Sequence, residues 1–213
     1  MKIIFDYDLS KDVWCLLNKG KSSINSPTPT KEYEKLTKDF GENPTEDDTK
    51  IFIEKFISDN NINKNEIIKK YQNDWDSISD RFQNIVEKVF EISLSKDITA
   101  YLSINSRCPY NIDENYFFIS IQNDLRTRKT AMHELWHFYT WYKFGLIWED
   151  KIGKEKYNEI KESLTVLLNI ECKDLLPDGI LDKGYTQHQE LRDKILKLWE
   201  ETKDINKLWN SLI

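Results

Sequence analysis

The residues best suited to chemistry lie in one short stretch, His133-Glu134-Leu135-Trp136-His137. On an α-helix, residues four positions apart lie on the same face, so His133 and His137 can direct two imidazole nitrogens at one point. Two imidazoles arranged in this way supply the first two ligands of a zinc ion. Glu134 is adjacent and can take a proton from a water molecule at the same point. The pattern therefore predicts a catalytic zinc centre.

The residues around this pattern predict a central, buried helix. Apolar side chains surround it on nearly every face, at Ala131, Met132, Leu135, Trp136, Phe138, Tyr139 and Tyr142. An alternative is a core helix whose two histidines only hydrogen-bond to the backbone. We favour the metal, because buried imidazoles without partners are costly and a shared ion satisfies both.

The His-Glu-x-x-His helix resembles that of the zincin metallopeptidases. The resemblance covers this helix and, more loosely, residues 97 to 195. It implies zinc-dependent hydrolysis of peptide bonds in a peptide or protein substrate, with a zinc-activated water and Glu134 as general base. It also implies a sheet edge beside the helix that binds substrate by strand addition, for which residues 115 to 121 are candidates.

A catalytic zinc commonly has three protein ligands and one water. The metzincin pattern is excluded, because Thr140 and Lys143 stand where it has glycine and histidine. A gluzincin-like centre takes its third ligand, a glutamate, from a following helix. The helix predicted over residues 154–170 offers Glu162, where its most apolar part begins. Glu159, one turn earlier, and His188 are the alternatives, or both glutamates are ordinary exposed charges.

Two residues beyond this helix are candidates for assisting catalysis. His188 or Tyr185 could donate a hydrogen bond to the oxyanion of the tetrahedral intermediate, as in some gluzincins. His188 is alternatively an exposed residue near the start of a helix predicted from Thr186. Arg192, one turn later, either binds a substrate carboxylate or pairs with an Asp or Glu.

The rest of the chain predicts an α+β scaffold, mostly helical, that would position these residues. The first ninety residues are predicted to form a short strand at 2–7 followed by packed helices. Strands at 98–104 and 116–121 then precede the metal helix, which runs to about Phe144 and is closed by Gly145. We predict a single domain, 1–213, with a helical N-terminal part (1–95) and a zincin-like catalytic core (96–213).

The composition is that of a folded protein with a modest acidic charge. The 213 residues are 39% hydrophobic and 13% aromatic, enough for a sizeable core. A net charge of −6 argues against nucleic-acid binding, and no apolar run approaches membrane-spanning length. Cys15, Cys108 and Cys172 are far apart and odd in number, which fits a reducing compartment. We therefore expect a cytoplasmic protein that binds neither nucleic acid nor membrane.

Two other functions are compatible with the sequence. The first is a zinc-dependent amidohydrolase that acts on a non-peptide amide by the same chemistry. The second is a non-enzymatic protein whose metal helix is structural or which binds a partner. A centre with four protein ligands would favour the second function, whereas an open coordination position would oppose it.

Overall fold

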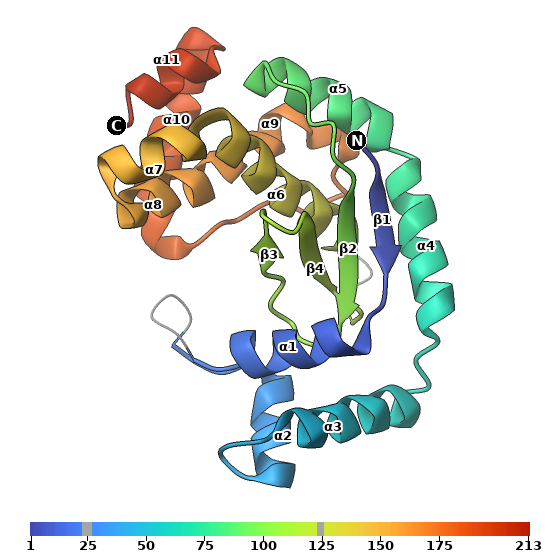
Figure 1. Ribbon diagram of the computed structural model, residues 1–213. Coiled ribbons are helices and arrows are strands. Elements are labelled where there is room, and N and C mark those ends of the chain that lie inside the picture. Colours follow the sequence, from blue (N-terminus) through green and yellow to red (C-terminus); the bar gives the residue numbers. More distant parts are fainter. Residues whose placement is uncertain (23–26, 123–125) are drawn as a thin grey trace. The chain divides into compact units, whose positions relative to one another are not determined.

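The computed structural model (Figure 1) describes residues 1–22, 27–122 and 126–213. These residues form two compact units. The first unit contains residues 1–77 and 96–130, and the second contains residues 78–95 and 131–213. Each unit thus combines segments from both sides of residue 95, where the sequence suggested a boundary. The described residues are mostly helical and include one small mixed sheet, which confirms the predicted α+β class.

The sheet belongs to the first unit and has the strand order β1-β2-β4-β3. The strands β1 (Ile3–Asp6), β2 (Ile98–Ser103) and β4 (Tyr116–Ser120) are parallel, and the short β3 (Tyr110–Asn111) is antiparallel to β4. The three parallel strands confirm the strands predicted at 2–7, 98–104 and 116–121. The sequence does not predict β3, because two residues are too few to form a recognisable pattern.

The strand β4 lies inside the sheet. Its Phe117 pairs with Ala100 of β2 on one side and with Tyr110 of β3 on the other. The backbone N–H of Phe118 also donates to the carbonyl of Pro109. Both sides of residues 116–118 are therefore occupied, and the expectation that this part of the strand is a substrate-binding edge is wrong.

The helices described in the first unit are α1 (Leu9–Lys19), α2 (Lys31–Phe40), α3 (Glu46–Asp59) and α4 (Lys64–Asp76). Each begins after a residue whose side chain accepts hydrogen bonds from the first turn, namely Asp8, Thr30, Thr45 and Asn63. In α3, Thr45 and Asp48 cap each other reciprocally. These caps satisfy backbone donors that would otherwise be left without a partner at the helix starts.

A side chain of α4 covers the outer edge of β1. The Oε1 atom of Gln72 accepts a hydrogen bond of 3.0 Å from the backbone N–H of Phe5. The Nε2 group of the same side chain donates a 3.0 Å hydrogen bond to the carbonyl of Ile3. The amide of Gln72 thus takes the place of a neighbouring strand.

A fully buried carboxyl group joins α1 to the end of β2. The Oδ1 atom of Asp12 accepts hydrogen bonds from the Ser103 hydroxyl at 2.6 Å and from the Ile104 N–H at 3.1 Å. Burial raises the pKa of Asp12 to about 7, although these hydrogen bonds act to lower it. The carboxyl is therefore largely protonated in mildly acidic solution.

The second unit is built from helices in its described residues. They are α5 (Ser79–Phe90), the part of α6 (Thr127–Thr140) beyond residue 130, α7 (Leu146–Ile152), α8 (Lys154–Leu164), α9 (Leu168–Glu171), α10 (Gln189–Thr202) and α11 (Ile205–Asn210). Short 3-10 segments lie at Thr165–Leu167, Lys173–Leu175 and Thr186–His188. The helix predicted over residues 154–170 is confirmed as α8 and the short helical segments that follow it.

None of the helices that the structure describes combines the length and the apolar character needed to cross a membrane.

Gly145 does not end α6 and its continuation, contrary to expectation. The chain continues from α6 through a π-helical turn (Trp141–Gly145) directly into α7. A Cβ atom at Gly145 would lie 2.2 Å from the ring of Trp141 and 2.7 Å from the hydroxyl of Tyr157. Glycine is therefore needed at position 145 for close packing. The continuous helix ends instead at Gly153, which has a positive φ of 85°.

The core of the second unit surrounds α6. Its residues Ala131, Met132, Leu135, Trp136, Phe138 and Tyr139 are fully buried, which confirms the predicted buried helix. Phe90 of α5 packs against Trp136, with ring centroids 5.0 Å apart. Beyond α6, Phe144 stacks on Trp209 of α11 at 4.1 Å. Large aromatic contacts therefore pack both α6 and the segment that follows it into this core.

Candidate metal centre

The two histidines of the motif face each other on α6. Their Nε2 atoms are 3.0 Å apart, and the ring planes meet at 82°. The side chain of His137 is 2% exposed and that of His133 is 17% exposed. The spacing of four residues thus brings the two nitrogens together inside the protein, as the sequence predicts.

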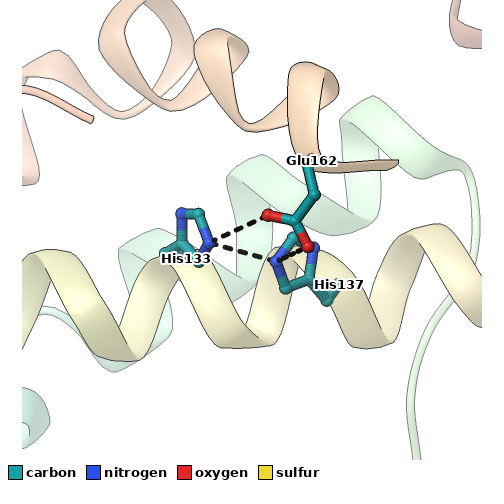
Figure 2. A group of neighbouring side chains, drawn as sticks. All are labelled: His133, His137 and Glu162. Carbon is teal, nitrogen blue, oxygen red and sulfur yellow. Dashed lines mark hydrogen bonds and ion pairs between the residues drawn. The ribbon is translucent and has the colours of Figure 1, made fainter. Parts of the chain in front are cut away.

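A carboxylate from α8 completes the group. Figure 2 shows the side chain of Glu162 reaching from α8 toward both imidazoles. Its Oε1 atom is 3.4 Å from Nε2 of His137, and its Oε2 atom is 3.8 Å from Nε2 of His133. One ligand atom from each of the three residues lies within 4.8 Å of the other two.

The spacing of these atoms fits a zinc ion. In a tetrahedral site with bonds of 2.0–2.1 Å, ligand atoms are separated by about 3.3 Å. The distances of 3.0, 3.4 and 3.8 Å are centred on this value. Two imidazoles and one carboxylate are also the donor set found in many catalytic zinc sites. Small shifts of the side chains would therefore suffice to hold the ion.

The alternative third ligands are placed elsewhere. Among the described residues, the group with metal-ligand spacing contains neither Glu159 nor His188. Glu159 is exposed on α8. His188 ends the 3-10 segment before α10, and its ring lies 5.5 Å from that of Tyr185 in an edge-to-face arrangement. A catalytic role for His188 stays a prediction.

Asp182 holds His133 in position, and no sequence pattern identifies it. Its Oδ2 atom accepts a hydrogen bond from Nδ1 of His133 at 2.6 Å, and the carboxylate is 1% exposed. With Nδ1 bonded to Asp182, Nε2 is the ring nitrogen of His133 that faces His137 and Glu162 and can serve as a metal ligand. A carboxylate behind a histidine ligand is a common feature of zinc sites.

Three side chains fix Asp182 in turn. The Thr165 hydroxyl donates to its Oδ1 atom at 2.8 Å, and the Arg192 guanidinium, 2% exposed, lies 3.2 Å from the same atom. Asn169 exchanges two 2.8 Å hydrogen bonds with the backbone of Asp182.

Of the two roles expected for Arg192, pairing with an acidic residue is confirmed. A hydrogen bond of 3.5 Å also joins Arg192 to the carbonyl of Glu162, so one guanidinium contacts both His133's partner and the backbone of the glutamate.

The charges of the group suit metal binding. Burial lowers the pKa of His137 to about 4, so this imidazole is neutral at neutral pH. Burial acts to raise the pKa of Glu162, but His137 and the ammonium group of Lys161 outweigh it and lower this pKa below its usual range. Both residues are therefore in the deprotonated form that a metal ion requires.

The pKa of His133 moves in the opposite direction. Burial acts to lower it, but the charge and hydrogen bond of Asp182 raise it above the usual histidine value. Glu134 and Glu162 add to this rise. Glu134 is itself buried on α6, 7% exposed, and its charge acts on the ring of its neighbour. A cation at Nε2 of His133 would take the place of the proton that Asp182, Glu134 and Glu162 favour.

Comparison of the chain with protein-family models, with curated proteins and with solved structures gives no match. The centre is therefore interpreted from its own geometry.

Proposed function

We propose that this protein is a zinc-dependent metallopeptidase whose second unit contains a zincin-like centre. His133, His137 and Glu162 would hold the ion. The observation that carries the proposal is the convergence of their three ligand atoms, together with the buried Asp182 that orients His133. A helix that only packed in the core would not need Glu162 beside both Nε2 atoms and Asp182 at Nδ1 of His133.

The residues around the centre have separate roles in hydrolysis. When bound, a zinc ion would act as a Lewis acid, which would polarise the scissile carbonyl and make water more acidic. Glu134 takes a proton from the attacking water and passes it to the nitrogen of the leaving amine. Asp182 keeps the proton of His133 on Nδ1, so that Nε2 remains available as a ligand.

The number of ligands favours a catalytic centre over a structural one. Structural zinc sites almost always have four protein ligands, whereas catalytic sites have three and an open position. The group found among the described residues contains three. This supports hydrolysis over the alternative of a metal that only stabilises the helix.

The choice of a peptide bond rests on the resemblance of the His-Glu-x-x-His helix to zincins. A non-peptide amide would be cleaved by the same residues in the same roles. The two substrate classes are distinguished by offering both to the purified protein.

The test combines elemental analysis with cleavage assays on the wild type and on Glu134→Gln. We expect about one zinc per chain in both proteins, as three protein ligands predict. The wild type should cleave members of a peptide mixture, detected by mass spectrometry, and Glu134→Gln should be slower by roughly 10²–10⁴. A wild type that neither contains nor takes up zinc would contradict the proposal, and an equally active variant would remove Glu134 from the mechanism. Cleavage of non-peptide amides alone would assign the amidohydrolase function.

A further inference from the structure

Lys161 is a buried lysine beside the glutamate of the centre. Its side chain is 7% exposed, and its Nζ atom lies 3.2 Å from Oε1 of Glu162. The same oxygen lies 3.4 Å from Nε2 of His137. Lysine is rarely buried to this extent unless it is paired. The ammonium group of Lys161, paired with Glu162, therefore lies at the edge of the group that would hold zinc.

A charge in this position has opposite effects on a cation and on an anion. Two positive charges repel, so the ammonium group of Lys161 opposes the binding of a zinc ion beside Glu162. Near a buried site the screening by water is weak, so charges a few ångströms apart interact more strongly than they would in solution. The same ammonium group would attract an anion bound to the metal. Lys161 is thus unfavourable for holding metal alone and favourable for holding metal with a negatively charged ligand.

We infer that Lys161 and the metal position together form a site for an anionic oxygen group. The ligand class is a carboxylate, or the oxygen of an amide as it becomes negative during hydrolysis. This inference rests on the proposed function, because it requires a metal held by His133, His137 and Glu162. The metal ion would be the first positive charge of the centre, and the inference assigns the second to Lys161. The prediction that His188 assists catalysis is independent of this inference.

A purely structural role for Lys161 gives the opposite expectation. If the lysine only held Glu162 in place, its removal would disorder a ligand and weaken zinc binding. If it supplies charge to a bound anion, its removal relieves repulsion, so zinc binding should be unchanged or tighter. The direction of the change in zinc affinity therefore separates the two roles.

The experiment compares the wild type with Lys161→Met, Lys161→Gln and Lys161→Arg. Lys156→Met serves as the matched control, because Lys156 is exposed on the same helix. Zinc affinity is measured by competition with a chromophoric chelator. The cobalt-substituted proteins are then titrated with acetate, an anion, and with imidazole, a neutral ligand, and binding is followed by visible absorption.

We expect both neutral variants to bind acetate roughly tenfold more weakly than the wild type, the effect of removing one nearby charge. Their affinity for imidazole should not fall, and their zinc affinity should be equal or higher. Lys161→Arg and Lys156→Met should behave as the wild type. Unchanged acetate binding, or weaker zinc binding in the neutral variants, would overturn the inference and leave the proposed function intact. A wild type that takes up no metal would overturn both.

Discussion

The Oδ2 atom of Asp182 lies 2.6 Å from Nδ1 of His133, although the two residues are 49 positions apart in the chain. Both oxygens of this carboxylate accept hydrogen bonds, because Thr165 donates to Oδ1 at 2.8 Å. The position therefore requires two acceptors, which aspartate has and asparagine lacks.

Changing Asp182 to Asn should weaken zinc binding by about 10- to 100-fold, the usual loss when the partner of a histidine ligand is removed. The amide NH₂ group would have to face a donor on one side, either His133 or the pair Thr165 and Arg192. Competition with a chelator measures the effect. Asp178→Asn, at an exposed position in the same segment, should bind zinc as the wild type does. Equal affinities for the two variants would show that Asp182 does not orient the ligand.

Changing Glu162 to Ala should reduce zinc affinity more than the Asp182 substitution, because it removes a ligand atom and not only its support. The matched change Glu159→Ala lies one turn away on the exposed side of α8 and should have no effect. Elemental analysis after dialysis against a weak chelator gives the zinc content of each protein. Zinc loss in Glu159→Ala with full retention in Glu162→Ala would reverse the assignment.

Changing Gly184 to Ala should destabilise the protein through Arg192. Gly184 has a φ of +59°, and a Cβ atom there would lie 2.5 Å from Nη1 of this buried guanidinium. The positive φ costs about 1–2 kcal/mol for alanine, and displacing Arg192 adds a further loss because it removes the cationic partner of the buried Asp182 carboxylate. Urea unfolding measures the free energy.

Gly179→Ala is the control for this prediction. Gly179 also has a positive φ, +73°, but a Cβ atom added there would have no neighbour within 4 Å among the described residues. Because both glycines have a positive φ, the difference between the two variants reports mainly the Arg192 contact. If both variants lose the same free energy of unfolding, the position of Arg192 does not depend on the absence of a side chain at residue 184.

The buried carboxyl of Asp12 should make stability depend on pH. Because its pKa is raised from 3.8 to about 7 in the fold, the folded state binds more protons than the unfolded state between these values. This contribution is fully present below the lower value and is lost as pH rises through the higher one. The loss is up to roughly 4 kcal/mol over the whole window, at about 1.4 kcal/mol per pKa unit.

Asp12→Asn removes this titration and keeps an oxygen that can accept from Ser103 and Ile104. The free energy of unfolding of the variant, relative to the wild type, should therefore rise between about pH 4 and about pH 7. Urea unfolding at several pH values gives this difference, and Asp39→Asn, at an exposed position, should show none. A constant difference for Asp12→Asn would mean that the carboxyl is ionised throughout.

The sequence predicts the parts of the centre that depend on local spacing. The four-residue interval between His133 and His137 places both rings on one face of any helix, and the apolar run after Glu162 predicts that this glutamate turns inward. Asp182 could not be found in this way, because its contact with His133 depends on how a distant segment returns to α6. Gly145 shows the same limit, since its contact with Trp141 depends on the π-helical turn that contains both residues, and its contact with Tyr157 comes from packing against α8.

The amide of Gln72 has a consequence for how this protein behaves at high concentration. An uncovered outer strand invites a strand from another molecule, which is a common start of aggregation. At β1 the backbone groups of Ile3 and Phe5 are already bonded within the chain. This side of the sheet is therefore closed to intermolecular strand pairing by a single side chain.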